Sequence, residues 1–333
     1  MRPEKYRLGI IGTGRIAHRF VPEARTVNGI VITAVYNPNV ESARRFAEEF
    51  AMEQDGNGLR VCESLNMLFE SVDAVYIASP HGSHYEYTKA AIEAGKHVLC
   101  EKPLCFSKGQ AEELFDLANA HRVVLMEAIK TAYCPGFQGL LKIIQGGRIG
   151  AIVDVEACFT KLVPSDVREV TDLQYGGSFI ELGTYVLLPI MKILGIESKA
   201  VNFWSSYFES GLDAYTKITL DYGNATATGK VGLGAKSEGE LIVTGTQGYI
   251  VVPVPWLLTK RVEIHYEDPN KVDVYEYPFE GAGLRYEVQI FVKRIGVMEL
   301  DEDTEEDENH GVSLEESAWI AGLMEGYLNR CYS

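Results

Sequence analysis

Residues 1–126 alternate short apolar runs with stretches whose apolar residues recur at helical spacing. Parallel strands that are covered by helices on both faces produce this pattern, because each connection between the strands is itself a helix. The predicted strands are 8–11, 30–36, 74–78, 97–100 and 123–126. The predicted helices are 16–25, 41–50, 85–94 and 107–120, the last with a capping box at its start. This part of the chain therefore predicts a doubly wound, parallel α/β sheet.

From residue 127 the pattern changes. Helical spacing predicts helices at 135–145, 178–194, 286–295 and 314–327, and period-two alternation predicts strands at 153–159, 201–207, 216–221, 225–231, 240–244 and 249–252. We predict two domains, 1–126 and 127–333, the second an α+β domain with a large, mostly antiparallel open sheet. The sheet face left uncovered by its own helices predicts a homodimer or homotetramer.

Composition excludes several classes of partner. The net charge of −16 over 333 residues offers no basic face for nucleic acid. No apolar run reaches the about 18–20 residues that span a bilayer, and the N-terminus has no signal-peptide core. Six scattered cysteines without a CxxC pair predict free thiols, a cytoplasmic location and no metal site. The acidic run 299–308 predicts a solvated loop.

A glycine-rich turn follows the first predicted strand and opens the first predicted helix. Gly12 permits a tight turn, Gly14 permits close approach of a pyrophosphate, and the small Ala17 permits close packing of helix on sheet. The backbone amides at such a helix start bind phosphates. The candidate cofactor contacts in this turn are Gly12, Thr13, Gly14, Arg15 and Ile16. Residues 1–126 are therefore expected to form an NAD(P)-binding Rossmann domain.

The end of the second predicted strand bears on the choice between NAD and NADP. An acidic residue there binds the ribose hydroxyls of NAD, whereas an arginine accepts the 2′-phosphate of NADP. This chain has Asn37, which binds a ribose without repelling a phosphate. The missing carboxylate gives a slight preference for NADP and leaves the choice open.

Two further segments follow strands at the carboxyl edge of the sheet, where ligands of such folds bind. Ser79 and Pro80 begin a loop that would contact the nicotinamide, and His84 lies near the following helix start. His84 either contacts the cofactor or serves the structure by capping that helix or bonding to backbone. The strand 97–100 is followed directly by Glu101, Lys102 and Pro103. Glu101 and Lys102 complete the candidate cofactor contacts.

With these motifs in place, the chain resembles the Gfo/Idh/MocA oxidoreductase family over nearly its whole length. The Glu101-Lys102-Pro103 stretch is the most specific part of the resemblance, and the glycine-rich start of the helix 178–194 is the second. Within the family the chain is most similar to the dihydrodiol dehydrogenase and glucose–fructose oxidoreductase-like branch, which has tyrosine where other members have histidine.

The resemblance implies hydride exchange between NAD(P) and a secondary alcohol or aldose carbon of a sugar, cyclic polyol or vicinal diol. It implies that Lys102 contacts the substrate hydroxyl and the nicotinamide ribose, and that Glu181 and Tyr185 are the acidic and aromatic members of the second motif. Residues four apart share a helix face, so Glu181 and Tyr185 project together. Tyr185 is the first choice as proton shuttle, with Lys102 making its phenol more acidic and polarising the substrate oxygen. Lys102 as the direct base is the alternative, and Glu181 would orient the lysine or a substrate hydroxyl.

Two departures from the family pattern concern the substrate. Glu181 stands where the family usually has aspartate, and Ala132 stands where the related branch often has arginine before its aromatic residue, here Tyr133. Lys130, two residues before Ala132, is the nearby cation. Tyr133, Lys130 and Arg285 are therefore candidate substrate-pocket residues, without an assigned substrate.

Two other functions remain open at this stage. A non-catalytic NAD(P)-binding sensor or regulator would keep the fold and bind both ligands unchanged. Alternatively, glycoside cleavage through transient oxidation would use tightly held NAD with no net redox change.

Overall fold

The computed structural model describes residues 5–51, 58–300 and 311–331. The chain forms two compact units, residues 1–130 with 280–321 and residues 131–279 with 322–333. Of the predicted acidic loop, 301–308 lies outside the described residues, and Glu299 belongs to a helix.

The first unit contains a six-stranded, fully parallel sheet in the order β3-β2-β1-β4-β5-β6. The strands are β1 (Tyr6–Ile11), β2 (Ile30–Tyr36), β3 (Arg60–Cys62), β4 (Ala74–Ile77), β5 (His97–Glu101) and β6 (Leu125–Ala128). The connecting helices are α1 (Arg15–Ala24), α2 (Val40–Ala51), α3 (Leu65–Ser71), η1 (His81–Ser83), α4 (His84–Glu93) and α5 (Lys108–His121). The strand order reverses between β1 and β4, which creates the crevice where such sheets bind ligands. The predicted doubly wound sheet is confirmed.

Some local predictions for this unit needed correction. The edge strand β3 and the helix α3 were not predicted, because three and seven residues are too short to display a clear period. Ser107 is the N-cap of α5 as predicted, yet its side chain makes no capping hydrogen bond.

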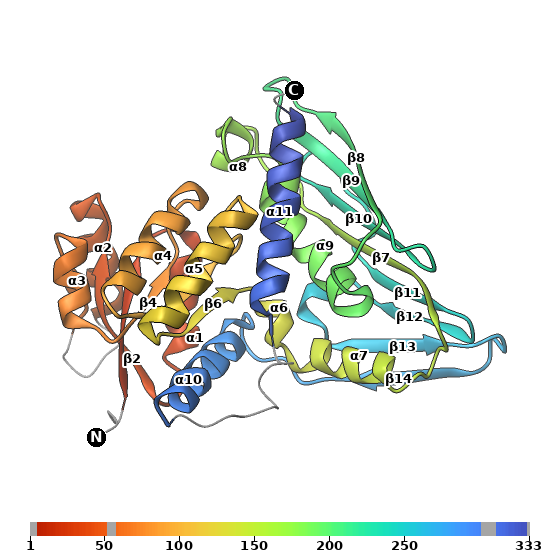
Figure 1. Ribbon diagram of the computed structural model, residues 1–333, viewed down its shortest axis with the longest axis horizontal. Helices are drawn as coiled ribbons and strands as arrows, with labels where there is room; N and C mark the ends of the chain where they lie inside the picture. Colours follow the sequence, from red (N-terminus) through yellow and green to blue (C-terminus); the bar gives the residue numbers. More distant parts are fainter. Residues whose placement is uncertain (1–4, 52–57, 301–310, 332–333) are drawn as a thin grey trace. The chain divides into compact units, whose positions relative to one another are not determined.

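The second unit contains an eight-stranded sheet in the order β14-β13-β12-β11-β7-β10-β9-β8, antiparallel except for the pair β7–β10. The strands are β7 (Ile152–Thr160), β8 (Ala200–Tyr207), β9 (Asp213–Asp221), β10 (Thr226–Gly232), β11 (Leu241–Gly245), β12 (Gly248–Val252), β13 (Arg261–His265) and β14 (Val272–Glu276). The helical elements are α6 (Lys130–Tyr133), α7 (Pro135–Gln145), α8 (Arg168–Thr171), α9 (Ser178–Leu194) and η2 (Trp256–Leu258). Helices α7 and α9 pack against this sheet (Figure 1). The mostly antiparallel sheet is confirmed, although β13 and β14 were not predicted.

The predicted boundary at residue 126 needs correction, because the first unit includes a later segment. Helix α10 (Leu284–Leu300) and the first part of α11 (Leu314–Cys331) belong to it. Tyr6 donates a 2.6 Å hydrogen bond to Glu299, and Ala318 and Ala321 join the core around β4 and β5. Both helices are amphipathic, and helical spacing alone does not say which sheet an amphipathic helix covers.

None of the helices within the described ranges has the length and apolarity required to cross a bilayer.

The five cysteines whose side chains are described are buried free thiols, namely Cys62, Cys100, Cys105, Cys134 and Cys158. The predicted cytoplasmic location stays a prediction.

Candidate active site

The glycine turn after β1 is shaped by two different demands. Gly12 has φ +100°, and a Cβ there would lie 2.6 Å from the carbonyl oxygen of Ala78, so the fold itself requires glycine. Gly14 has φ −82°, and a Cβ there would meet no protein atom nearer than 4.0 Å. The fold alone therefore does not require glycine at position 14. A ligand that approaches the backbone closely does.

The start of α1 suits a phosphate group. Arg15 and Ile16 form its first turn, its N-cap is Gly14, which has no capping side chain, and Ala17 is fully buried against the unit's core. The backbone amides at a helix start carry a partial positive charge. Together with the open space at Gly14, this arrangement fits the pyrophosphate of a dinucleotide.

Polar side chains link the end of β2 to the glycine turn. Asn37 donates a 2.7 Å hydrogen bond to Thr13 Oγ1, and its own Oδ1 accepts from the Asn39 amide. Thr13 Oγ1 also lies 2.8 Å from Ser42 Oγ on α2. Ser42 was not among the predicted site residues, and its signal was a hydroxyl near the start of the helix that follows β2.

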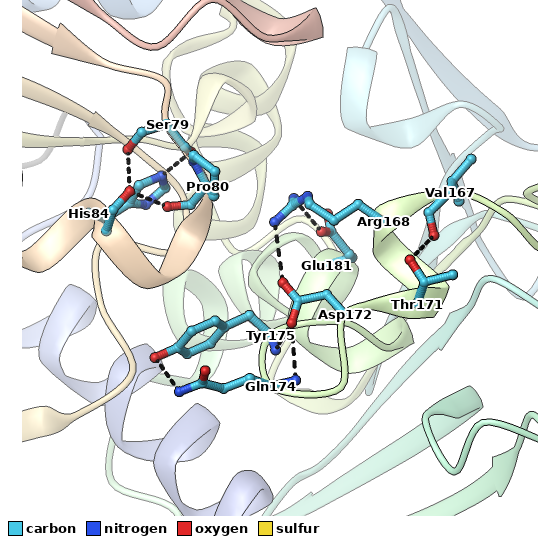
Figure 2. A network of polar contacts seen from close by, with 11 residues as sticks. Ser79, Pro80, His84, Val167, Arg168, Thr171, Asp172, Gln174, Tyr175 and Glu181 are labelled. Atoms are coloured by element: carbon cyan, nitrogen blue, oxygen red, sulfur yellow. Dashed lines mark hydrogen bonds and ion pairs between the residues drawn. The ribbon is translucent and has the colours of Figure 1, made fainter. Parts of the chain in front are cut away.

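The loop after β4 is held by backbone and side-chain bonds. Ser83 Oγ donates a 2.7 Å hydrogen bond to the Pro80 carbonyl oxygen and lies 2.8 Å from Ser79 Oγ. The ring of His84 contacts the Ser79 carbonyl oxygen (Figure 2) and, through its other nitrogen, the Pro103 carbonyl oxygen. His84 is 0% exposed. The structure thus places its ring on the backbone, which agrees with the structural alternative for His84.

Lys102 lies directly after β5 and is buried together with carboxyl groups. Tyr76 donates a 2.6 Å hydrogen bond to Glu101. Glu127 on β6 accepts from the Leu104 amide at 3.0 Å and from Ser317 Oγ on α11 at 2.7 Å. The turn that carries Lys102 is therefore anchored to the neighbouring strand and to a helix distant in sequence.

Three buried carboxyl groups in this region have raised pKa values. Burial raises the pKa of Glu101, and burial raises the pKa of Glu127 to about 7. Burial and the charge of Glu101 raise the pKa of Glu287 on α10 well above its ordinary value. Glu287 is 0% exposed, and neither of its oxygens has a hydrogen-bond partner among the residues that the structure describes. A buried carboxylate without donors is costly, so the site favours the protonated form of Glu287.

Replacing Glu287 with glutamine is expected to flatten the pH dependence of stability. A raised folded-state pKa contributes stability that is fully present below the unfolded pKa of about 4.3 and is lost as pH rises through the folded pKa. The variant should therefore gain on the parent protein by up to about 1.4 kcal/mol per pH unit across that window. Urea unfolding at about pH 5, 7 and 9 measures the difference.

Glu113→Gln is the matched control. Glu113 is exposed, and its hydrogen bonds from Lys89 and Tyr85 lower its pKa, so its replacement should give a small effect of opposite sign. Parallel stability profiles for Glu287→Gln and the parent protein would contradict a raised pKa of Glu287.

In the second unit, α9 carries the remaining predicted catalytic residues. Glu181 and Tyr185 are half-buried and lie one helical turn apart on the same face. Arg168 on α8 donates a 3.2 Å hydrogen bond to Glu181 and lies 4.0 Å from Asp172 (Figure 2). The ring of Tyr185 packs edge-on against Phe159 at a centroid distance of 5.3 Å.

The start of α9 is fixed by a buried aspartate on β9. Asp213 accepts a 2.9 Å hydrogen bond from the Phe179 amide and a 2.6 Å bond from Thr216 Oγ1. Gly177 has φ +99°, and a Cβ there would lie 2.1 Å from Asp213 Oδ1, so only glycine fits. Sequence reasoning missed Arg168 and Asp213. The nearest signal was the Gly176-Gly177 pair, which marked a tight helix start without indicating its partner.

The candidate substrate residues have structural contacts of their own. Lys130 donates a 2.9 Å hydrogen bond to the Ala282 carbonyl oxygen. Arg285 pairs with Glu23 at 3.0 Å and with Glu280 at 2.8 Å, which ties α10 to α1. Tyr133 on α6 is buried. A substrate role for Arg285 would require it to leave two ion pairs.

Comparison with known proteins identifies the family. Residues 6–129 match the oxidoreductase family with an NAD-binding Rossmann fold, and residues 137–251 match the Gfo/Idh/MocA C-terminal domain. The chain belongs to the Gfo/Idh/MocA oxidoreductase family. It is 31% identical over 329 residues to a scyllo-inositol 2-dehydrogenase (NADP(+)) of Bacillus subtilis (strain 168), covering 96% of this chain and 95% of the relative.

Two further relatives illustrate the range of this oxidoreductase family. A trans-1,2-dihydrobenzene-1,2-diol dehydrogenase of Xenopus laevis is 26% identical and covers 97% of each chain. The crystal structure of a 3-ketoreductase from Actinomadura kijaniata with NADP and TDP-benzene superposes with a TM-score of 0.78 at 24% identity, covering 97% of this chain and 96% of that one. This last similarity concerns the fold.

Proposed function

We propose that this oxidoreductase transfers a hydride between NADP and a secondary alcohol or aldose carbon of a sugar, cyclic polyol or vicinal diol. The observation that carries the proposal is the buried Lys102 at the carboxyl end of β5, on the same sheet edge as the glycine turn after β1. Family relatives that act on an inositol and on a dihydrodiol support the substrate class.

The proposed roles follow from what each group can do. The bound nicotinamide accepts or supplies the hydride. Oxidation of an alcohol also requires that the hydroxyl proton leave, and Tyr185 is assigned this step as general base in oxidation and general acid in reduction. Lys102 polarises the substrate oxygen and favours loss of the tyrosine proton. Glu181, already bonded to Arg168, orients a substrate hydroxyl.

The cofactor preference is expected to depend on Asn37. Aspartate in its place keeps the bond from the Asn39 amide and accepts a hydrogen bond from the Thr13 hydroxyl, so the local fold is retained. The new carboxylate would repel a 2′-phosphate and bind ribose hydroxyls instead. Asn37→Asp should therefore weaken NADPH binding by about 10- to 100-fold, on the order of 1.4–3 kcal/mol, while NADH binding is kept or improved. An unchanged NADPH affinity would contradict the position assigned to Asn37.

The first test is a fluorescence titration of the purified protein with NADPH and NADH, followed by turnover of a panel of inositols, aldoses and cyclic diols. Tighter binding of NADPH and reduction of NADP by a panel member support the proposal. Binding of cofactor and polyol without turnover would favour the sensor. Cofactor that remains bound through purification and shows no net redox change during turnover would favour glycoside cleavage through transient oxidation.

We propose that the second unit forms a homodimer or homotetramer through the open face of its sheet. Trp204 is 60% exposed and Tyr249 42%, while their chain neighbours Phe203 and Ile250 face the packed side. Large exposed apolar residues on one sheet face are typical of subunit contacts. Sedimentation of the parent protein and of Trp204→Asp tests this, since a monomeric parent protein would contradict it.

A further inference from the structure

The ring of His84 lies between two backbone carbonyl groups. Its Nδ1 is 2.8 Å from the Pro103 oxygen and its Nε2 is 2.9 Å from the Ser79 oxygen. The side chain begins α4 and is completely excluded from solvent. One ring thus connects the loop that follows β4 with the turn that follows β5 and carries Lys102.

We propose that His84 is held as an imidazolium cation and is the positioning residue for Lys102. A carbonyl oxygen only accepts hydrogen bonds, so each ring nitrogen must donate. A neutral ring has a single N–H, and its other nitrogen would direct a lone pair at a carbonyl oxygen less than 3 Å away. Only the doubly protonated ring satisfies both contacts.

The surroundings of the ring are compatible with a cation. The buried titratable side chains on elements that pack against α4 are His81 on η1, Tyr76 on β4, and Cys100 and Glu101 on β5. On the exposed side, Glu113 of α5 bonds to Lys89 and Tyr85 of α4. The ring of His81 meets that of His84 edge-on, with 5.5 Å between the ring centroids. Hydrogen bonds from a charged donor are stronger than neutral ones, and the two carbonyl contacts would satisfy both N–H groups of the buried ring.

The consequence for the site is a pH-dependent fixation of Lys102, and this part rests on the proposed function. Loss of the second proton would remove one of the two carbonyl contacts. The ring would then no longer connect the turn after β5 with the loop after β4. A displacement of about 1 Å at a reacting group lowers turnover by as much as 10²-fold.

Nitrogen NMR of the protein labelled with ¹⁵N-histidine tests the charge directly. At about pH 7.5 both ring nitrogens of His84, assigned by comparison with His84→Phe, should give the signals of protonated nitrogens. His97 is the internal control, because its Nδ1 accepts from the Val124 amide and must give an unprotonated signal. An unprotonated signal from either nitrogen of His84 between about pH 6 and 8 would overturn the proposal. This measurement needs no turnover, so its outcome is separate from that of the proposed function.

Kinetics test the positioning role. His84→Phe and His84→Gln should lower kcat by about 10- to 100-fold, with the dissociation constant for NADPH changed less than about twofold. In the parent protein, loss of the second proton of His84 should lower kcat as the pH rises. This decline should be absent from both variants. His97→Gln, at the opposite end of β5, should retain the parent kcat and pH profile. An unchanged kcat and profile in a folded His84 variant would contradict the role.

Discussion

Replacing Lys102 with alanine is expected to lower kcat by at least about 10³-fold while NADPH binding stays detectable. The lysine is assigned both the polarisation of the substrate oxygen and the acidification of the tyrosine, and such groups contribute about 10²–10⁴-fold each. The pyrophosphate, in contrast, is assigned to the glycine turn and the start of α1, which the substitution leaves intact. Stopped-flow turnover and a fluorescence titration on the same preparation measure the two effects separately.

The matched control for this variant is Lys96→Ala. Lys96 lies just before β5, whereas Lys102 follows it. The Nζ of Lys96 donates a 3.1 Å hydrogen bond to the Val72 carbonyl oxygen. If the loss of any lysine beside β5 impaired the enzyme, both variants would be less active. Near-parental turnover by Lys102→Ala would remove the lysine from the proposed mechanism.

Replacing Tyr185 with phenylalanine is expected to lower kcat by about 10²–10⁴-fold, with a small change in KM. The ring packs edge-on against Phe159, and phenylalanine preserves this contact. The substitution therefore removes the hydroxyl group with little effect on packing. Measurement of kcat and KM over a range of pH also reveals whether the tyrosine accounts for the group that titrates during turnover.

Tyr175→Phe is the control in the same unit, since its hydroxyl accepts a 2.9 Å hydrogen bond from Gln174 and has no assigned role in catalysis. It should retain the parent activity. A loss of less than tenfold in Tyr185→Phe, together with a complete loss in Lys102→Ala, would assign the proton transfer to Lys102. The pair of variants thus resolves the choice that the sequence left open.

The sequence predicted most elements, because the spacing of apolar residues along a long segment shows whether it is a helix or a strand and which face is buried. The helices α7 and α9 have the predicted bounds, and β2 does as well. The failures include β3 and α3, which are too short to show a period, and the neighbouring strands β13 and β14, of which β14 has exposed alternating residues that resemble a loop. The assignment of α10 to the second domain failed for another reason, since its packing partners lie more than 250 residues earlier in the chain.

The backbone of the candidate site can be predicted from the sequence where a motif dictates it. The glycine turn is the example, because Gly12 has φ +100°, a backbone conformation that favours glycine and so leaves a local signal. Contacts made across the fold leave no such signal. Three such residues reach their positions through tertiary packing alone. Glu287 interacts with the charge of Glu101, Ser317 bonds to Glu127, and Asp213 holds the start of α9.

The place of α10 and the first part of α11 in the first unit determines which unit is completed first during synthesis. Residues 131–279 are interposed in the sequence between the two parts of that unit. On the ribosome, the second unit's sheet is therefore complete before the nucleotide-binding unit has received its last helices. Until residue 321 emerges, Glu127 lacks its hydrogen bond from Ser317, and the apolar surface that Ala318 and Ala321 cover remains open to water. A nascent chain that stalls shortly before α11 would expose this surface to chaperones, although its glycine turn has long been made.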